Sequence, residues 1–599
     1  MDGNTKNKIC ILDEATINKI AAGEVIERPA SVIKELIDNA IDAGATDVRV
    51  EILGCLSTLV TIVDNGCGMS KNDVSIAFLK HATSKIRSAD DLFAISTMGF
   101  RGEALSSIAA ISKLTITTRQ DDDISGTKLV VEGGDLKNVS DIGAAVGTRV
   151  IVEDLFYNTP ARKKYLKSDR TELAHVTDVV TRYALGNTEV SFTLISDGKT
   201  ILRAPASDSL FDRIIHVLGT DVAKAMIPVS FESEWAKVSG FVSQPELTRS
   251  GNDLQSFFVN GRSVNSKAIS NALRLGYYTL IPKGRYPAAV LNVLIDPKDV
   301  DVNVHPAKTE VRFGYEKEVM DAITKAIEEA HRSQVAPEID YKEQTVQLLL
   351  DDSEPEPKSI LKPSVEHTLR ESTPSYNTSV KDTERRLKRT ERELLATKSD
   401  ITDNVSSAGV LDDVKILGQI DNLYIIAQSR DGLLIIDQHA AHERILYDQV
   451  KDRKTSGWQE LITPLTIELN AKERILLEEY IPYLEEFGFA ISEFGTNTYV
   501  ITSIPNIFGK LEDPDIVHDI ISDILSTGRI RDETGIYEHV SKSMACRGAI
   551  KAGAACSPEQ MENLIAQLMR TENPKTCPHG RPTFIPFSKK ELDKLFGRI

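Results

Sequence analysis

The feature that most restricts how this chain can fold is a central stretch, residues 336–410, that cannot form a hydrophobic core. The segment from Asp352 to Pro357 is acidic and contains two prolines, and the segment from Lys381 to Arg392 carries dense charge of both signs. Serine and threonine are frequent there and aromatic residues almost disappear, a composition typical of flexible linkers. We therefore predict two folded halves joined by a tether, with domains at residues 1–209, 210–335 and 411–599. In the second of these domains, residues 256–259 are a predicted strand that ends in the turn pair Asn260 and Gly261.

The chain as a whole has the composition of an ordinary globular protein. Its 599 residues are 41% hydrophobic and 27% charged, and this length allows several domains. No apolar run is long enough to span a bilayer, the first residues lack the apolar core of a signal peptide, and the six cysteines are scattered. We therefore expect reduced thiols, no membrane association and a cytoplasmic location.

The charge balance limits how the protein can contact nucleic acid. A net charge of −17 argues against a chain that coats DNA through bulk electrostatics. If DNA is a partner, contact must come from metal ions or from local basic patches. The candidate patches are Arg162, Lys163, Lys164 and Lys167 in one run, and Arg262 with Lys267 in another. A solvated surface explains such runs as well as DNA contact does.

The most informative segment of the first half, from Lys34 to Gly44, has the pattern of a helix. Its apolar side consists of Ile33, Leu36, Ile37, Ala40 and Ile41. Glu35, Asn39 and Asp42 fall together on the opposite side. Pro29 suits the first turn of this helix and Gly44 suits its end. An ordinary amphipathic helix has the same pattern, so the segment indicates a function only in combination with the strands and turns after it.

Two strands and several glycine-containing turns come after this helix. Residues 47–52 alternate as a strand, and a second strand, residues 59–63, leads into Asp64, Gly66 and Gly68. Glycines let the backbone approach a ligand closely, and a carboxylate fixed at a strand end can accept a hydrogen bond from an amine such as that of adenine. The glycine-flanked residues 98–103 open a predicted helix, whose free N–H groups can bind phosphate. Gly147 and Thr148 then lead another strand.

A helix with Glu and Asn one turn apart, then Asp-x-Gly-x-Gly, a glycine-rich lid and Gly-Thr resembles the ATPase module shared by type II topoisomerases, heat-shock chaperones, histidine kinases and MutL. Longer strings narrow the resemblance to the MutL family of DNA mismatch-repair proteins. They are Ile20 to Val25, His81 to Lys85, Gly99 to Leu105, Asn158 to Arg162 and His305 to Lys308. The resemblance implies an α/β (α+β) multidomain fold, in which a Bergerat-type ATPase sandwich precedes a ribosomal-protein-like second domain. The linker then leads to a C-terminal α/β domain for dimerisation and DNA cleavage.

The resemblance also implies roles in ATP hydrolysis for individual residues. Glu35 would act as the general base for the attacking water, and Asn39 would bind the Mg²⁺ that accompanies ATP. Asp64 would contact adenine with support from Thr148, and Lys308 would reach the terminal phosphate from the second domain. The remaining predicted nucleotide-binding residues are Gly66, Gly68, Met69, Thr83, Ser84, Lys85, Gly99, Phe100, Arg101, Gly102 and Glu103.

A second candidate site lies after the linker. Residues 433–436 form a predicted buried strand that leads into Asp437, and His439 and Glu443 follow with the spacing of one helical face. Much later, Cys577 and His579 form a compact Cys-x-His pair. Imidazole, carboxylate and thiolate together make a mixed ligand set for zinc or manganese, and Asp437 would bridge to a second metal. Two metals that hold a phosphodiester can activate water against DNA.

The strings Asp-Gln-His-Ala-x-x-Glu, Ala-Cys-Arg and Cys-Pro-His-Gly-Arg-Pro-Thr resemble those MutL proteins that carry an intrinsic endonuclease, which adds Cys546 to the predicted metal ligands. One position departs from the pattern, because Asp448 stands where the motif of these relatives closes with a glutamate. We leave this shorter carboxylate out of the ligand set. The departure supports a rival hypothesis, an ATP-operated scaffold with a purely structural metal. A chaperone or topoisomerase would leave the MutL strings unexplained.

The resemblance finally implies partners. The protein is expected to be a homodimer whose N-terminal arms close on ATP, and to act on double-stranded DNA downstream of the mismatch sensor MutS. The segment from Gln459 to Pro464 contains Gln-x-x-Ile-x-Pro, a pattern for docking to the sliding clamp that also occurs often by chance.

Overall fold

The computed structural model describes residues 22–23, 25–54, 58–85, 98–99, 102–282, 284–301, 311–335, 414–451, 457–495, 497–506, 515–526, 533–549 and 554–599. The predicted linker lies outside these ranges, and so do Phe100, Arg101 and Lys308. The predicted domain boundaries remain predictions. None of the helices in the described ranges is long and apolar enough to cross a membrane.

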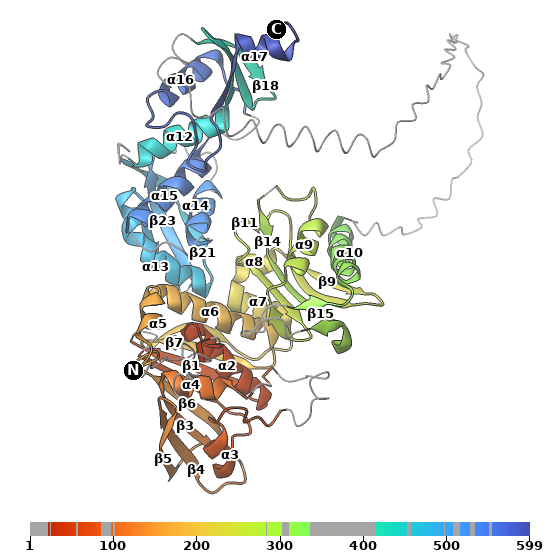
Figure 1. The fold of residues 1–599 in the computed structure, drawn as a ribbon, viewed down its shortest axis with the longest axis vertical. Helices are drawn as coiled ribbons and strands as arrows, with labels where there is room; N and C mark the ends of the chain where they lie inside the picture. Colours follow the sequence, from red (N-terminus) through yellow and green to blue (C-terminus); the bar gives the residue numbers. More distant parts are fainter. Residues whose placement is uncertain are drawn as a thin grey trace, which may run out of the picture. The chain divides into compact units, whose positions relative to one another are not determined.

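The first part of the chain forms an eight-stranded sheet with helices packed against it (Figure 1). Its spatial order is β5-β4-β3-β6-β2-β1-β7-β8, and its pairs are antiparallel except β1 with β7. The strands are β1 (Asp47–Leu53), β2 (Leu59–Asp64), β3 (Lys113–Arg119), β4 (Gly126–Glu132), β5 (Asp135–Ile142), β6 (Gly147–Glu153), β7 (Ser191–Ser196) and β8 (Lys199–Ala204). The helices are α2 (Pro29–Asp42), α3 (Lys71–Ile76), α4 (Ala104–Ile111), α5 (Pro160–Tyr165) and α6 (Asp169–Gly186).

Helix α2 confirms the prediction made from its periodicity. Pro29 lies in its first turn, and Gly44, with φ of +72°, follows its end. The predicted apolar side, from Ile33 to Ala40, is buried in the core beneath the sheet, whereas Ile41 is only partly buried. Burial of this side leaves Glu35 and Asn39 at the edge of the core.

The second part of the chain forms a five-stranded sheet in the order β13-β12-β15-β10-β9, against which α9 and α10 pack. The predicted turn at Asn260 and Gly261 joins β12 to β13, and both residues have positive φ. The strands are β9 (Met226–Glu232), β10 (Lys237–Ser243), β12 (Gln255–Val259), β13 (Arg262–Val264) and β15 (Ala289–Leu294), with short pairs β11 (Thr248–Arg249) with β14 (Tyr286–Pro287) and β16 (Val300–Asp301) with β17 (Arg312–Phe313). The helices are α7 (Leu210–Leu218), α8 (Thr220–Lys224), η2 (Pro297–Asp299), α9 (Lys267–Gly276) and α10 (Glu316–Val335).

The chain after the linker contributes two further sheets. One has the order β18-β19-β20-β24 and belongs to a compact unit of its own, whereas residues 439–551 and 570–581 lie outside that unit. The other sheet has the order β21-β23-β22. The strands are β18 (Lys415–Ile420), β19 (Tyr424–Ser429), β20 (Gly432–Asp437), β21 (Trp458–Glu468), β22 (Ala490–Glu493), β23 (Thr498–Pro505) and β24 (Phe584–Ser588). The helices are α12 (Gln438–Lys451), α13 (Ala471–Glu486), α14 (Asp515–Ser526), α15 (Glu533–Gly548), α16 (Pro558–Leu568) and α17 (Lys589–Leu595).

One expectation about this sheet was wrong. Residues 433–436 were predicted to be a buried strand, but in β20 only Leu434 and Ile436 are buried, and Leu433 and Ile435 are partly open to solvent. The reason is that β20 lies in an antiparallel sheet with one covered face, so its side chains alternate between core and surface.

Candidate functional site

The adenine end of the predicted nucleotide pocket lies where β2 ends beside the start of β6. Asp64 is the last residue of β2 and pairs in register with Thr148. The backbone N–H of Gly66 donates to Asp64 Oδ1 at 2.9 Å, which fixes the carboxylate. Burial raises the pKa of Asp64, and the Gly66 N–H opposes that rise. A fixed carboxylate of this kind can accept a hydrogen bond from an amine of a ligand.

Thr118 is a residue of this pocket that the sequence patterns did not single out. Its buried hydroxyl accepts a hydrogen bond from Met69 N at 2.9 Å and donates to the carbonyl oxygen of Gly147 at 3.1 Å. It also lies 3.1 Å from the hydroxyl of Thr148. Because β3 and β6 are neighbours only in space, the alternating pattern of β3 gives no sign of this contact.

Two glycines of the predicted motifs occupy positions that no side chain would fit. Gly147 has φ of +114°, and a Cβ there would lie 2.2 Å from the carbonyl oxygen of Asp64. Gly102 has φ of +64°, and its Cβ would lie 2.6 Å from the carbonyl oxygen of Ala82. Such positive φ values strain any residue with a side chain. Gly147 therefore lets β6 lie against the end of β2 at Asp64. Gly102 lets its own loop lie against the predicted nucleotide-binding segment at Ala82.

The polar side of α2 holds Glu35 and Asn39 next to basic side chains. Lys34 Nζ lies 3.5 Å from Glu35 Oε1. The ammonium of Lys85, in the predicted nucleotide-binding string, donates to Asn39 Oδ1 at 3.0 Å. A positive charge therefore lies against the oxygen that we predicted to bind Mg²⁺, so this position suits a cation.

Asp42 was predicted on the polar side of α2 but not as a site residue. Its side chain is only 6% exposed and accepts a hydrogen bond from Lys85 Nζ at 2.5 Å. It also accepts from the backbone N–H groups of Met98 at 2.8 Å and Gly99 at 2.9 Å. Asp42 thus connects α2 to two segments that lie more than 40 residues further along the chain.

Arg262, a candidate for DNA contact, lies in the packing between the first two sheets. Burial lowers the pKa of Arg262, and the negative charges of Asp38 and Asp42 oppose this effect. Asp38 is itself buried and accepts a hydrogen bond from the hydroxyl of Tyr183. This environment favours a role for Arg262 in domain packing over DNA contact.

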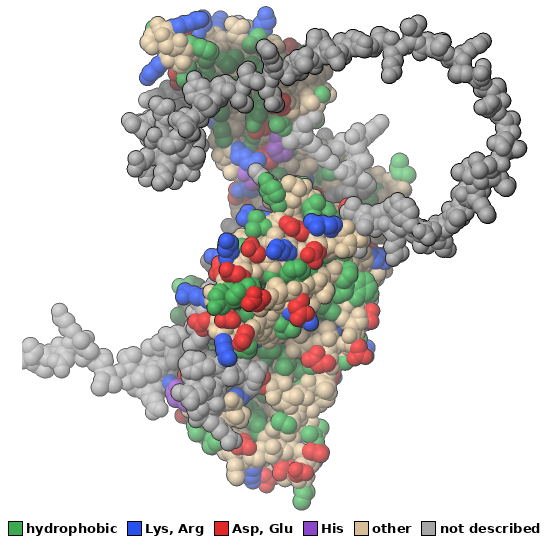
Figure 2. Space-filling model, turned by 90° about the vertical axis from the view of Figure 1, so that its right-hand side faces the viewer, with side chains coloured by type: hydrophobic (Ala, Val, Ile, Leu, Met, Phe, Trp, Pro, Cys, Tyr) green, Lys and Arg blue, Asp and Glu red, His purple; other side chains and the backbone are tan. Residues whose placement is uncertain are grey.

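In the other candidate basic run, Lys163 and Lys164 are exposed, and Arg162 and Lys167 are partly exposed. Helix α5 has no buried residue, and its last turn carries Arg162, Lys163 and Lys164. On the face drawn in Figure 2, basic side chains of the described residues are interspersed with acidic ones. The α5 run is therefore the stronger of the two candidate patches.

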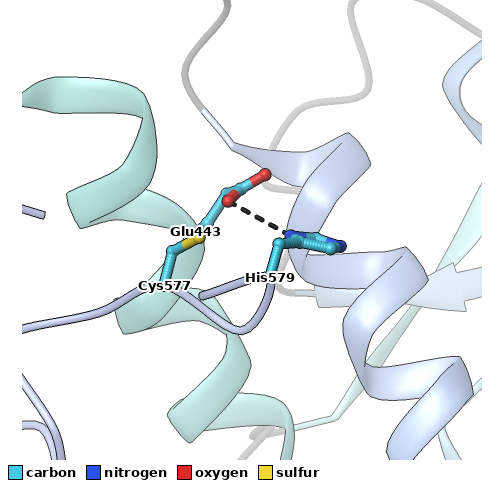
Figure 3. A group of neighbouring side chains, drawn as sticks. All are labelled: Glu443, Cys577 and His579. Atoms are coloured by element: carbon cyan, nitrogen blue, oxygen red, sulfur yellow. Dashed lines mark hydrogen bonds and ion pairs between the residues drawn. The ribbon is translucent and has the colours of Figure 1, made fainter. Parts of the chain in front are cut away.

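The candidate metal centre collects side chains from distant parts of the sequence (Figure 3). His439 and Glu443 lie one turn apart on α12, as predicted, with His439 Nε2 3.3 Å from Glu443 Oε1. His579 Nδ1 lies 3.4 Å from Glu443 Oε2. One possible ligand atom from each of Glu443, Cys577 and His579 lies within 4.8 Å of the other two. Zinc, with bonds of about 2.0–2.3 Å to such atoms, fits this set of donors.

The protonation of these side chains is strongly shifted. Burial would raise the pKa of Glu443, but hydrogen bonds from His439, His579 and Cys577 hold it well below its usual range. Burial, together with the Glu443 carboxylate, raises the pKa of Cys546, on α15, to about 12. Burial also raises the pKa of Cys577. Because thiolates are the metal ligands, an ion that binds here would displace protons from both cysteines.

Asp437 lies at the end of β20, directly before α12, as predicted. Its backbone N–H donates to the carbonyl oxygen of Thr583 at 2.9 Å. The group formed by Glu443, Cys577 and His579 does not include Asp437, and its role as a bridge to a second metal remains a prediction.

Asp448, which we left out of the ligand set, makes hydrogen bonds that hold the segment before Cys577 in place. It accepts a hydrogen bond from Arg444 Nη1 at 3.1 Å and another from the backbone N–H of Glu572 at 2.8 Å. Arg444 also donates through Nε to the carbonyl oxygen of Thr576 at 2.7 Å, one residue before Cys577. Asp448 therefore ties α12 to the segment that carries Cys577.

The predicted clamp-docking segment lies in β21. The pairing of β21 with β23 shifts register between Glu460 and Leu465, so the residues between them leave the regular ladder. Within this irregularity the side chain of Ile462 is fully exposed, and Trp458 is largely exposed. An apolar side chain presented in this way is available to a partner.

Three protein-family models match successive parts of the chain. Residues 26–145 match "Histidine kinase-, DNA gyrase B-, and HSP90-like ATPase", and residues 214–332 match "DNA mismatch repair protein, C-terminal domain". Residues 417–556 match "MutL C terminal dimerisation domain". Fold and matches together define a multidomain α/β protein with an N-terminal ATPase domain of the histidine kinase, gyrase and HSP90 type.

Full-length relatives narrow this class. The chain is 42% identical to the DNA mismatch repair protein MutL of Methanoculleus marisnigri, over 99% of this chain and all of that protein. It is 41% identical to the MutL of Methanocorpusculum labreanum and 37% identical to that of Thermoanaerobacter pseudethanolicus, again over 99% of this chain and all of each relative. The chain belongs to the MutL family of DNA mismatch-repair proteins. Its second sheet belongs to the transducer domain of that family, and its C-terminal part is the dimerisation domain.

Proposed function

We propose that this protein uses ATP binding and hydrolysis in its N-terminal domain to control DNA nicking by its own C-terminal metal centre during mismatch repair. Family membership accounts for the ATPase and dimerisation domains. The observation that carries the nuclease half is the grouping of Glu443 with Cys577 and His579, next to His439.

In the proposed ATPase reaction, Glu35 accepts the proton of the water that attacks the terminal phosphate. Asn39 offers a neutral oxygen to the magnesium ion of the nucleotide, and Asp64 accepts a hydrogen bond from the adenine amine. Glu35→Ala should therefore still bind ATP but hydrolyse it very slowly. Turnover at the wild-type rate in this variant would show that the base has been assigned wrongly.

In the proposed nuclease centre, Glu443, His439, His579, Cys577 and Cys546 hold zinc or manganese, which supplies Lewis-acid activation of water and phosphate. Arg444 and Asp448 keep the loop before Cys577 against α12. We propose that the carboxylate of Asp437, directly before the same helix, orients a second ion or the attacking water.

The test is nicking of supercoiled circular DNA by the purified full-length protein, with Mn²⁺ and then with a chelator. We expect wild type to convert circles to the nicked form only with metal, and Asp437→Asn to be inactive while it keeps the metal ion held by Glu443, Cys577 and His579. If both proteins leave the DNA intact, even with clamp and mismatch sensor present, the metal is structural and the protein is an ATP-operated scaffold.

We also propose that the chain forms a homodimer through the open face of the sheet β18-β19-β20-β24. In antiparallel strands, residues directly opposite each other lie on the same face. Ile435 pairs with Ile426 on β19 and with Ile585 on β24, and Tyr424 pairs with Ile420 across the β18–β19 hairpin. All five residues are partly or largely exposed, so an apolar surface spans the sheet.

A charge within this surface should separate the subunits. We expect Ile585→Glu to be monomeric by light scattering at concentrations where wild type is dimeric. Ile124→Glu is the matched control, because Ile124 is a fully exposed isoleucine in the loop between β3 and β4, away from this sheet. A dimeric Ile585→Glu would exclude this face as the interface.

The exposed Ile462 supports a further proposal, that β21 docks to the sliding clamp. Replacement of Gln459 and Ile462 by alanine should abolish clamp-stimulated nicking and leave basal nicking intact. If the clamp still stimulates nicking by this variant, docking of the clamp to β21 is excluded. Contact with MutS and with double-stranded DNA, and a cytoplasmic location, are proposed from family membership.

A further inference from the structure

We propose that Asp42 is a positioning residue of the nucleotide site. Its carboxylate holds the Met98–Gly99 segment and the Lys85 ammonium next to Asn39. In this arrangement the ammonium occupies the cation position of Asn39 until a magnesium–nucleotide complex displaces it. The inference rests on the proposed binding of ATP at this site.

The contacts of Asp42 use its whole carboxylate. Oδ1 accepts the N–H of Met98 at 2.8 Å, and Oδ2 accepts the N–H of Gly99 at 2.9 Å together with Lys85 Nζ at 2.5 Å. Bonds to a charged acceptor are stronger than bonds between neutral groups, and the side chain is almost fully shielded from water. Three segments of the chain therefore meet at one carboxylate.

The position of Asp42 in its helix is unfavourable for a negative charge. Asp42 is the last residue of α2, where the partial charge of the helix dipole is also negative, and the last turn of α2 contains no basic residue. Such a carboxylate needs compensation from elsewhere in the fold. Here the compensation comes from Lys85 and from the two N–H groups of the 98–99 segment.

Gly99 shows how closely these groups approach. A Cβ at Gly99 would lie 3.0 Å from Lys85 Nζ and 3.7 Å from Asp42 Oδ2. The ammonium thus lies beside both the Gly99 backbone and the carboxylate, and Asn39 Oδ1 is 3.0 Å away from it. A side chain at residue 99 would have to displace the ammonium.

The arrangement has a direct consequence for the order of binding. A magnesium ion on Asn39 Oδ1 and the Lys85 ammonium would be two cations on one oxygen, and their mutual repulsion makes them compete for it. When the magnesium–nucleotide complex arrives, the ammonium must leave Asn39, and its positive charge is then free to contact a phosphate. Asp42 keeps the two N–H groups in place during this exchange.

The test compares wild type with Asp42→Asn, which keeps the shape of the side chain and removes its charge. Without nucleotide, we expect the amide hydrogens of Met98 and Gly99 to exchange with solvent at least several-fold faster in the variant. In ATPase assays we expect KM to rise about tenfold while kcat changes by less than about twofold, because Glu35 is untouched. Equal exchange rates and an equal KM would overturn the inference.

The matched control is Asp141→Asn. Asp141 bonds to Lys71 at 2.8 Å in an exposed pair on the same domain, so its loss removes the same kind of charge pair outside the site. This variant should behave as wild type in both assays. If wild type itself binds no ATP, the proposed function fails, but the exchange measurement still decides whether Asp42 holds the 98–99 segment.

A second variant covers the case in which Asp42→Asn does not fold. Lys85→Met leaves Asp42 and the two amide groups in place and removes the competing cation. We expect the Mg²⁺ concentration for half-maximal binding of a fluorescent ATP analogue to fall several-fold. Binding of the analogue without Mg²⁺ measures the loss of any phosphate contact of Lys85. A Mg²⁺ requirement that is unchanged or higher after this loss is subtracted would show that Lys85 does not compete for Asn39.

Discussion

The substitution Asp64→Asn tests most directly whether Asp64 recognises the adenine base in the nucleotide pocket. In wild type the Gly66 N–H donates to Asp64 Oδ1 at 2.9 Å, and the asparagine oxygen of the variant can still accept this hydrogen bond. The other carboxylate oxygen becomes an NH₂ group, so a donor would face the adenine amine, which is also a donor. Loss of a bond to a charged acceptor, with a buried donor left unpaired, costs about 2–3 kcal/mol. We therefore expect adenine nucleotides to bind about 30- to 150-fold more weakly.

The same change should alter selectivity in a predictable direction. Inosine nucleotides carry a carbonyl oxygen where adenine carries the amine, and the asparagine NH₂ can donate to that oxygen. Wild type should bind ADP much more tightly than IDP, and Asp64→Asn should lose or invert this preference. Titration calorimetry with both nucleotides measures the two affinities. Binding of ADP by the variant within about threefold of wild type, with the preference against IDP retained, would refute the assignment of Asp64.

Three further predictions concern separate parts of the molecule. Gly102→Ala should raise the Kd of a fluorescent ATP analogue about tenfold through contact with Ala82, whereas Gly198→Ala, at a similar φ but with open space around it, should not. Asp448→Ala should weaken zinc binding about 10- to 100-fold in a chelator competition while ATP binding stays unchanged. Burial lowers the pKa of His331, so its neutral form stabilises the fold above pH 6.5 and this contribution is lost as the pH falls through the lowered pKa. His331→Phe should therefore show a smaller drop in Tm between pH 7.5 and 5.5 than wild type.

The elements that the sequence predicted best are those defined by a local repeat. Helix α2 follows from its period of 3.6 residues, and the turn between β12 and β13 follows from Asn260 and Gly261. The pair His439 and Glu443 was also predictable, because residues four apart on a helix share a face wherever the helix lies.

The residues that the sequence missed act through contacts between distant segments. Asp42 and Thr118 look like an ordinary helix residue and an ordinary strand residue until Met98 and Met69 come next to them. Cys546 was predicted only through family resemblance, since nothing in its own segment marks it as a neighbour of Glu443.

The misjudged burial of β20 has a related cause. A run of four apolar residues suits a strand covered on both faces, and it suits equally a strand whose outer face meets a partner. The sequence of a single chain does not distinguish core from interface, because both are apolar. Only the folded sheet identifies Ile435 as a surface residue, because there it lies opposite Ile426 and Ile585.

The pairing of β20 with β24 has a consequence for biosynthesis. The strand β24, Phe584–Ser588, is the edge partner of β20, and Cys577 and His579 come shortly before it in the sequence. A ribosome must therefore translate the whole stretch between Glu443 and Cys577 before these side chains can come together. If the proposed function holds, a product that ends before Cys577 would carry the ATPase domain but lack two of the proposed metal ligands, and we expect it not to nick DNA.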